Sequence, residues 1–332
     1  RTGVIARISD PGILKMIEER GIPTVVLEPN TVELTDLQHK LGLGVIRINP
    51  EATGETGADH LFSRGFQQFA FCGFANRIWS DLRQEAFVAA IESHNLKCEC
   101  YPLPKGDILL DEERPLLRKW IESLPRPIGL MACDDDRARQ VLEACESLGL
   151  RVPQEIAVLG AADDELLCEL SSPPLSSIAF DLEKAGFEAM KQLAGLIDGS
   201  LTKPYDIIVN PLWVTTRLST DYIVQNDRLV TQALRFIRRN YFRPIAVIDV
   251  VKHVDVSRRT LENRFLAATG RTIMDDIIHQ RFERAKQLLI STDEPVAVIS
   301  ILSGFVNYRS MLHAFNMSEH CTPNEFRQKW RQ

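Results

Sequence analysis

The sequence lacks the features that mark membrane-spanning, secreted and disulfide-stabilised proteins. No apolar run approaches the roughly 18 residues needed to cross a bilayer, and nothing at its start reads as a secretory signal. The seven cysteines are odd in number and lie mostly within apolar runs, which argues against a disulfide framework and for a reducing compartment. We therefore predict a soluble, cytoplasmic protein with no membrane partner.

Motifs of the common enzyme classes are also missing. The sequence contains no G-x-G-x-x-G, G-x-x-x-x-G-K-[ST], G-x-S-x-G or H-E-x-x-H. Cys98, Cys100 and His94 lack the paired spacing of a structural zinc site. Acidic residues are available for acid/base work or for Mg²⁺, but no nucleophile with a nearby base accompanies them. We predict that the protein is not an enzyme and has neither cofactor nor bound metal.

Charge divides the chain into two parts. Its 332 residues suffice for about two domains, and 45% of them are apolar, which excludes a disordered chain. Residues 225–332 carry 17 Lys and Arg against 11 Asp and Glu, whereas residues 1–224 carry 22 against 34. This asymmetry favours nucleic acid or an anionic membrane as the partner of the basic part. We expect domains at 1–222 and 223–332, with a polar linker between Asp221 and Leu229.

The first two thirds of the chain alternate between strand-like and helix-like segments. Short apolar runs rich in β-branched residues include TVVLE, FAFCGF, IGLMAC and IAVLGAA, and amphipathic segments such as DLRQEAFVAAIESH lie between them. Such alternation predicts βαβ units and a doubly wound α/β fold with a parallel sheet. Ligands of such sheets bind at the carboxyl ends of the strands, so function is expected there.

Polar residues follow three of these predicted strands. Carboxylates and arginines hydrogen-bond sugar hydroxyls in pairs, and an indole ring lies flat on a sugar ring. The sequence therefore predicts a carbohydrate site, for which the candidates are Trp79, Arg83, Asp134, Asp135 and Asp163.

The alternative role for each acidic residue is a helix cap or a first-turn residue stabilised by the helix dipole. We favour that role for Asp136 and Glu165, whereas both roles remain open for Asp134 and Asp135. Arg83, which the pattern places on the first turn of a helix, is less readily explained as structural because the dipole disfavours a cation there.

These segments resemble the effector-binding domain of LacI-type repressors, itself similar to type I periplasmic sugar-binding proteins. The matching runs are RGFQQFAFCGF, WSDLRQEAF, ACDDDRARQVLEACESLGLRVPQEIAVLG and PPLSSIAFD. The resemblance implies an α/β domain of two lobes around a sugar. It also implies that Arg83, Asp134 and Asp135 contact the sugar and that Trp79 lines the cleft.

The sequence departs from this family at three positions. Ala162 stands where the sugar-binding carboxylate usually is, Asn49 replaces a usual Asp, and Asp134 replaces a usual Asn. Loss of a charge-assisted hydrogen bond costs roughly 1.5–3 kcal/mol, so the identity of the sugar is left open. By the same comparison Arg1 falls inside the first lobe, whose initial elements we expect to be missing.

The basic part is predicted to be all-helical and to contain a helix-turn-helix. A short helix and a polar turn precede a second helix over 257–270, for which Ser257 is a good N-cap and Gly270 a natural C-cap. Leu261 and Phe265 form an apolar i, i+4 pair that faces inward. Two short helices joined by a tight turn are typical of a helix-turn-helix.

If that pair faces inward, Arg259, Glu262 and Asn263 project together from the opposite side. These residue types read base edges in the major groove, whereas the flanking Arg258 and Arg264 can reach phosphates. Ser257, at the start of the helix, belongs to the same candidate surface. The alternative is an ordinary solvated helix face with Arg–Glu pairing.

A second unit of the same kind follows about fifty residues later. The runs PIAVIDVV and SRRTLENRF, then RFERAKQLL and VAVISILSGF, and finally TPNEFR resemble the AraC family, in which one long helix joins two helix-turn-helices. The resemblance implies recognition helices in successive major grooves, about 34 Å apart. In the second unit Tyr308, Arg309 and His313 point outward by alignment, but Asn316 and Met317 stand where the family often has cations.

The sequence therefore predicts a two-lobe periplasmic-binding-protein-like α/β domain followed by an AraC-type domain with two helix-turn-helices. The expected function is a sugar-responsive transcription regulator of pentose (xylose-type) or related carbohydrate genes. Expected partners are operator DNA, a small sugar effector, RNA polymerase and a second copy of the chain. The alternative is a sugar-binding sensor or carbohydrate enzyme whose C-terminal domain does not bind specific DNA.

Overall fold

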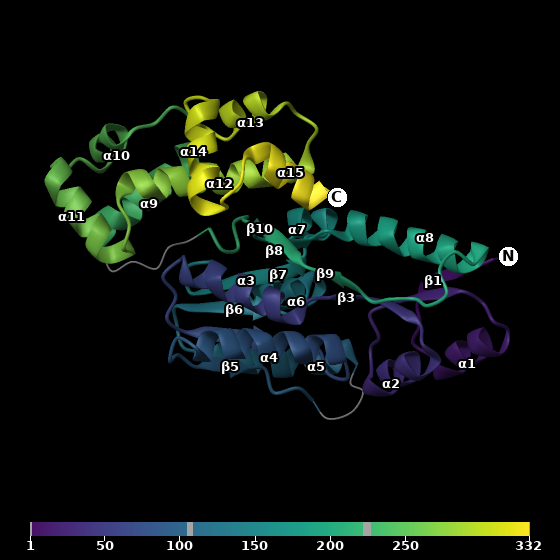
Figure 1. Cartoon of the computed structure of the whole chain (residues 1–332). Coiled ribbons are helices and arrows are strands. Elements are labelled where there is room, and N and C mark those ends of the chain that lie inside the picture. The colour runs from purple at the N-terminus through teal and green to yellow at the C-terminus, as the bar shows by residue number, and fades with distance from the viewer. Residues whose placement is uncertain (1, 105–108, 222–226, 332) are drawn as a thin grey trace. The chain divides into compact units, whose positions relative to one another are not determined.

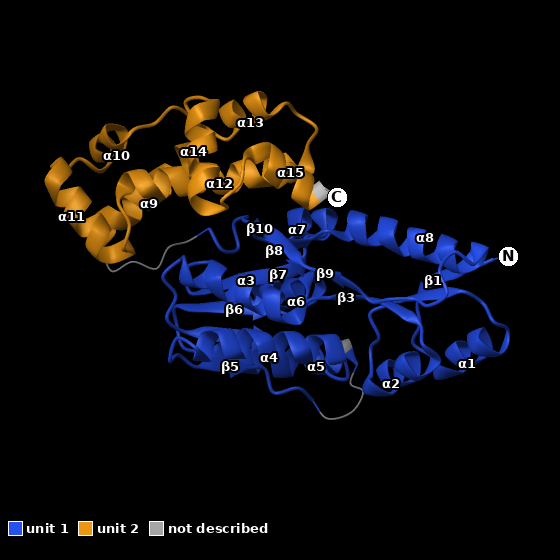
Figure 2. Cartoon of the chain, viewed as in Figure 1, with its two compact units in different colours: residues 1–222 blue, residues 223–332 orange. Residues whose placement is uncertain are grey.

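Two compact units make up the protein. The computed structural model describes residues 2–104, 109–221 and 227–331. The units comprise residues 1–222 and 223–332 (Figure 2), and of the described residues only those of the first unit form strands. Most of the linker expected after Asp221 lies outside the described residues.

The first sheet of unit 1 has four parallel strands in the order β1-β2-β3-β9. Their bounds are β1 Val4–Arg7, β2 Thr24–Leu27, β3 Gly44–Ile48 and β9 Ile207–Val209. The accompanying helices are α1 (Pro11–Glu19), α2 (Val32–Leu41) and α8 (Leu182–Asp198), of which α8 packs on β1, β2 and β9. Strand β2 is buried on both faces, as the apolar runs predict, whereas β1 is only partly buried and Ile208 of β9 is exposed.

The second sheet has six strands in the order β10-β8-β7-β6-β4-β5. Their bounds are β4 Phe69–Cys72, β5 Cys98–Cys100, β6 Ile128–Ala132, β7 Ile156–Ala162, β8 Ser176–Phe180 and β10 Pro211–Thr215. The expected parallel sheet needs one correction, because β10 runs antiparallel to β8. Only Asn210 separates β9 in the first sheet from β10 in the second. The chain therefore reaches this edge directly, without the crossover helix that a parallel strand requires.

Helices cover both faces of the second sheet. They are α3 (Pro50–Phe62), α4 (Ile78–Glu92), α5 (Leu110–Ser123), α6 (Asp135–Ser147) and α7 (Glu165–Leu170) (Figure 1). Strand β4 shows why both faces are apolar. Phe69 and Phe71 contact aromatic rings of α3 and α4, whereas Ala70 and Cys72 lie in the core formed with α5 and α6. Successive side chains of a strand point to opposite faces, so a run without polar residues is buried on both.

Unit 2 consists of helices. Their bounds are α9 Arg228–Asn240, α10 Val247–Val254, α11 Arg258–Thr269, α12 Ile273–Ser291, α13 Val296–Leu302, α14 Tyr308–Ser318 and α15 Pro323–Arg331. The long helix α12 joins two small cores (Figure 1). Its first half gives Ile273 and Ile277 to the core shared with α9, α10 and α11, and its second half gives Phe282 and Leu289 to the core shared with α13, α14 and α15.

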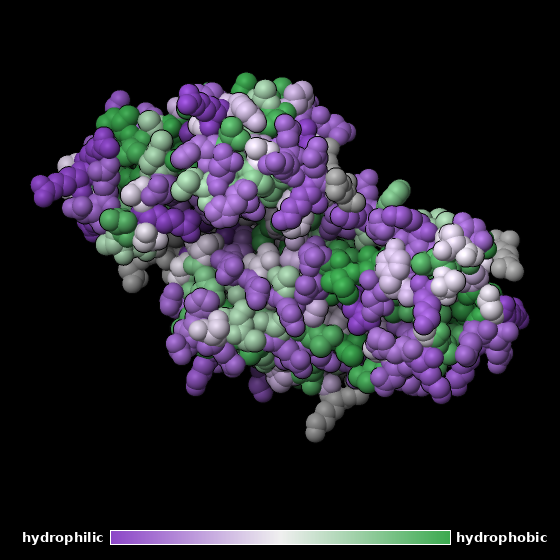
Figure 3. Space-filling model, in the orientation of Figure 1, coloured by the Kyte–Doolittle hydropathy of each residue, from purple (hydrophilic) through white to green (hydrophobic). Residues whose placement is uncertain are grey.

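The caps of α11 form as the sequence predicts. The Ser257 hydroxyl accepts a hydrogen bond from the Thr260 N–H at 3.2 Å, and Gly270 ends the helix in the left-handed region at φ 69°. Leu261 and Phe265 are completely buried. These contacts fix which face of α11 remains exposed, and hydrophilic side chains cover most of the molecular surface seen in Figure 3.

Candidate functional site

A cavity of about 150 Å³ lies where residues that follow β2 and end β3 meet the first turns of α4. Its polar lining comprises Glu28, Thr35, Arg47, Trp79 and Arg83. The structure thus brings two of the predicted sugar-site residues, Trp79 and Arg83, together with side chains of the first sheet. An engineered cavity of similar size takes one benzene molecule, so this volume suits a single small ring.

Arg83 is buried, with 3% of its surface exposed. It is the sixth residue of α4 and therefore lies on the second turn, not on the first turn that the sequence pattern suggested. Its guanidinium donates to the carbonyl of Cys133, the residue after β6, and lies 5.7 Å from the centres of the Trp79 and Phe180 rings. The Nε atoms of Arg83 and Arg47 are buried and have no hydrogen-bond partner among the described residues. Both arginines also line the cavity, and guanidinium groups there are suited to an oxygen-rich ligand.

Glu28 faces these arginines and was missed by the sequence analysis. Burial raises the pKa of its carboxyl group, and the positive charges of Arg83, Arg7 and Arg47 partly oppose that shift. The Ile48 N–H donates to its Oε1 at 3.3 Å. Glu28 directly follows β2, so the rule that singled out residues after other strands also points to it.

Asp134 and Asp135 do not line this cavity. Asp134 caps α6 by accepting a hydrogen bond from the Arg137 N–H at 2.8 Å. Asp135, 2% exposed, accepts from the Ser177 hydroxyl at 2.5 Å and from the Asp164 N–H at 2.9 Å. Burial raises the pKa of Asp135 to about 6, against the lowering effect of these hydrogen bonds. Both acids therefore have internal roles in this structure.

Asp163 is likewise bonded within the protein. Its two oxygens accept from Arg217 Nη1 at 2.8 Å and from the Thr215 hydroxyl at 2.5 Å. Ala162 and Asp163 both have positive φ angles, of 149° and 53°. Residues other than glycine seldom adopt this backbone conformation, because it is strained for them. Arg217 also binds Glu169 at 2.6 Å, so one arginine holds the strained turn against α7. Sequence reasoning missed Arg217 because it lies 54 residues from Asp163 in the chain.

On α11, Arg259 and Asn263 are exposed opposite the buried apolar pair. Glu262 is half-buried, and its Oε1 forms an ion pair with Arg258 Nε at 2.8 Å. Arg264 is exposed and donates from Nε to Asp227 at 2.5 Å. The face predicted from periodicity therefore exists, but two of its five polar side chains between 258 and 264 are tied to each other and a third to the start of α9.

On α14, Tyr308, Arg309 and His313 are all exposed. The Asn307 side chain caps this helix by accepting from the Ser310 N–H at 2.9 Å, and Met311 and Phe315 are buried beneath it. The second helix-turn-helix thus presents the predicted residues, with one arginine on its exposed face where α11 has three.

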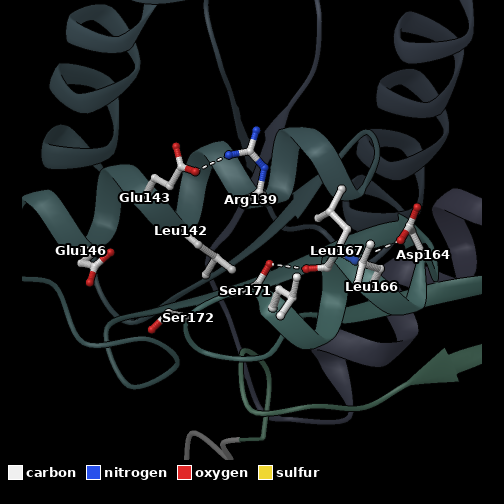
Figure 4. A pocket seen from close by; sticks show the side chains of 10 residues that line it. Arg139, Leu142, Glu143, Glu146, Asp164, Leu166, Leu167, Ser171 and Ser172 are labelled. Atoms are coloured by element: carbon white, nitrogen blue, oxygen red, sulfur yellow. Dashed lines mark hydrogen bonds and ion pairs between the residues drawn. The ribbon is translucent and has the colours of Figure 1, made fainter.

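A larger depression of about 500 Å³ lies between α6 and α7 (Figure 4). Exposed leucines Leu166 and Leu170 line it together with Leu142 and Leu167, and Arg139, Glu143 and Glu146 stand along α6. Arg139 is bonded to Glu143 within this rim. An apolar floor with a charged rim is typical of a protein–protein contact.

Comparison with known proteins covers nearly the whole chain. Residues 58–220 match the model of a periplasmic binding protein-like domain, and residues 250–329 match a helix-turn-helix domain. The xylose operon regulatory protein of Haemophilus influenzae is 32% identical over 98% of this chain and 84% of its own length. That of Escherichia coli (strain K12) is 33% identical over 98% and 83%. The chain belongs to the family of xylose operon regulatory proteins.

Solved structures agree with this placement in the xylose operon regulatory family. A structure described as xylose-binding transcription activator XylR is 30% identical, covers 99% of this chain and 87% of that one, and has a TM-score of 0.59. A lac repressor dimer bound to operator has a TM-score of 0.51 at 19% identity, which shows the fold alone. The predicted resemblance and fold class are confirmed.

As a member of this family, the chain is a sugar-responsive transcription regulator with a DNA-binding unit. Within residues 2–104, 109–221 and 227–331, no group of three or more His, Cys, Asp or Glu side chains could hold a metal ion. In the same ranges, no helix combines the length and the apolar character that a membrane crossing needs.

Proposed function

We propose that this chain senses a pentose, in the first place xylose, and controls carbohydrate genes by binding operator DNA in the cytoplasm without catalysing a reaction. One observation carries the proposal. Two arginines, Arg47 and Arg83, each have a buried Nε without a partner among the described residues, and both line a cavity with space for one small ring. The names of the relatives and of the solved neighbour support xylose as the sugar.

The cavity offers the groups that a monosaccharide needs. Arg83 and Arg47 can donate to ring and hydroxyl oxygens, Glu28 can accept from hydroxyl groups, and the Trp79 ring offers an apolar face. Trp79 Nε1 is already bonded to Asn30 Oδ1 at 3.2 Å, so the indole is held in place before a ligand arrives. Preorganised side chains lose less entropy on binding.

The same arrangement explains how a sugar can act on the rest of the molecule. Glu28 and Arg47 come from the first sheet, whereas Trp79 and Arg83 come from α4 on the second. A sugar that bonds to both sets favours the arrangement in which the two sheets are close. Its effect on DNA binding then depends on the difference in sugar affinity between the two states.

DNA contacts are assigned to the exposed faces of α11 and α14. On α11, Arg259 and Asn263 suit base edges, and the residues suited to phosphates are Ser257, Arg258 and Arg264. Glu262 can accept a hydrogen bond from a base only if its ion pair with Arg258 breaks. On α14, Tyr308, Arg309 and His313 form the corresponding surface. We assign most of the sequence reading to α11 because it carries more exposed arginine.

We assign a homodimer contact to the depression between α6 and α7. Leu166 and Leu170 are 71% and 77% exposed, a large apolar area for a free surface, and the acidic and basic side chains of α6 allow self-complementary pairing. Leu170→Asp is expected to give a monomer in sedimentation experiments without unfolding. Persistence of the dimer would contradict this assignment. RNA polymerase is a further proposed partner, with exposed Ile301 and Val306 as a surface for it.

Two measurements test the function. Thermal unfolding with a panel of pentoses and hexoses should show stabilisation by a pentose, because a ligand of the folded state adds RT ln(1 + [L]/Kd) to stability. DNA binding should weaken steeply as salt rises, since phosphate contacts release counterions. No shift with any sugar would remove the sensing role. A flat salt response would favour a sensor or carbohydrate enzyme that does not bind specific DNA.

A further inference from the structure

One ion pair connects the proposed recognition helix to the start of unit 2. Arg264 Nε on α11 donates to Asp227 Oδ2 at 2.5 Å, although the two residues are 37 positions apart in the chain. Half of the Arg264 side chain is exposed, compared with 19% of Asp227. The carboxylate is therefore the anchored partner and the guanidinium the accessible one.

Asp227 is held on its other side by α9. It is the N-cap of that helix, and its Oδ1 accepts from the N–H groups of Leu229 at 2.9 Å and Val230 at 3.4 Å. One carboxylate oxygen thus closes the helix end and the other binds Arg264. Because both oxygens are engaged, the carboxylate has a fixed orientation, and so does the arginine edge that it binds.

The contact uses only one edge of the guanidinium. Its Nη1 and Nη2 groups have no hydrogen bond or ion pair to another described residue. Arg264 lies one residue beyond Asn263, so it projects about 100° further round α11, beside the face assigned to base edges. A flanking position suits a phosphate, and the two Nη groups are the part of the fork left to bind it.

We propose that Asp227 is a positioning residue for DNA binding, which holds Arg264 through Nε and directs its Nη groups at a phosphate beside the site of α11. The inference rests on the proposed function of α11. Its physical basis is entropic, because a free arginine side chain loses much rotamer freedom when it binds, whereas one that is already held loses less. The opposite effect, in which the carboxylate withholds Arg264 from DNA, would require the carboxylate to occupy the Nη groups.

The variant Asp227→Ser separates the two functions of this carboxylate. Serine caps a helix almost as well as aspartate does but has no charge with which to hold Arg264. Asp255→Asn is the matched control, since it removes one negative charge from the same unit at a left-handed position that asparagine tolerates. Arg264→Ala and the double variant Asp227→Ser/Arg264→Ala complete a cycle that isolates the coupling.

The probe is a duplex enriched by the native chain from a randomised pool. We expect Asp227→Ser to weaken its affinity about two- to fivefold, the range of a single exposed ion pair. In the Arg264→Ala background the same change should have no effect, and Asp255→Asn should leave binding unchanged or tighten it. Unfolding curves would show that every variant is folded.

Tighter or unchanged binding by Asp227→Ser would overturn the inference, as would an equal loss in both backgrounds. These results would leave the proposed function in place. If the native chain enriches no sequence and binds duplex DNA without salt dependence, the proposed function and the inference both fail.

Discussion

Two polar clusters in unit 1 differ in whether their hydrogen bonds are made. Both carboxylate oxygens of Asp135 and of Asp163 accept a hydrogen bond from the protein, and Arg217 donates to both Asp163 and Glu169. Around the cavity, Arg47 and Arg83 each keep a buried Nε without a partner in the described part of the chain.

Under the proposed function, this difference distinguishes the polar groups that hold the fold from those left to bind the sugar. A buried donor without a partner costs stability, so it persists in a protein when a ligand or water supplies the missing bond. A saturated cluster has little left to offer a ligand but holds strained backbone in place, as Arg217 does for Ala162 and Asp163. Variants in the two clusters should therefore have opposite effects.

The largest effect is expected from Arg83→Met. Two or more charge-assisted hydrogen bonds to the sugar would be lost, which corresponds to at least about a hundredfold loss of affinity. Stability should not fall, because methionine fills much of the space and removes a buried charge. Calorimetric titration with xylose and thermal unfolding give the two readouts. Undiminished affinity would place the effector elsewhere.

Asp135→Asn tests the saturated cluster through pH. Because burial raises the folded-state pKa of Asp135 from 3.8 to about 6, the protonated acid stabilises the fold. This contribution is complete below about pH 4 and is lost as the pH rises to about 6. Asparagine does not titrate there. The free energy of unfolding of the variant minus that of the native chain should therefore rise by up to about 3 kcal/mol between about pH 4 and pH 6.

Urea unfolding at a series of pH values measures that difference directly. Acids that do not interact with Asp135 titrate equally in both chains, so their contributions cancel, whereas the neighbouring Asp134 adds a smaller difference through its charge interaction with Asp135. A difference that does not change between pH 4 and pH 6 would contradict the raised pKa.

Arg217→Met should lower stability and leave sugar affinity almost unchanged, the reverse of what we expect for Arg83→Met. Removal of this half of a largely buried ion-pair network leaves Asp163 unpaired on a strained turn, and we expect a loss of about 2 kcal/mol of stability. Sugar affinity should change less than about twofold, since neither residue lines the cavity. A large loss of sugar affinity with normal stability would return Asp163 to the role of an effector contact that its sequence position suggested.

Much of the fold could be predicted from the sequence because its signals are local. The apolar runs TVVLE, FAFCGF, IGLMAC and IAVLGAA marked β2, β4, β6 and β7, and the Ser257 and Gly270 caps with the Leu261–Phe265 pair placed α11 and its exposed face. Helical periodicity decides which side of a helix is buried, so the candidate DNA surface of α11 followed from spacing, whereas that of α14 came from the family resemblance.

The cavity was less accessible to sequence reasoning because it depends on contacts between distant segments. Arg83 and Asp163 were both chosen because they follow a predicted strand. Arg83 lines the cavity, whereas Asp163 is bonded to Arg217, two residues beyond β10. Which of the two is available to a ligand depends on burial and on pairing with a residue 54 positions away in the chain. No local sequence pattern encodes burial or such pairing. Glu28 fitted the rule and was overlooked, whereas Arg217 fitted no rule.

The same comparison between engaged and unengaged groups applies on α11, where the smallest differences are expected. Arg258 is bonded to Glu262, whereas Arg259 has no hydrogen bond or ion pair to another described residue. Arg259→Ala should weaken binding to the selected duplex about tenfold and relax its sequence preference, as loss of a base contact does. Arg258→Ala should weaken binding about twofold on all sequences, because Arg258 is held through Nε by Glu262 and we expect its Nη groups to contact a phosphate rather than a base. Equal losses in the two variants, measured by competition against mixed-sequence DNA, would show that the internal pair does not govern which arginine reads the DNA.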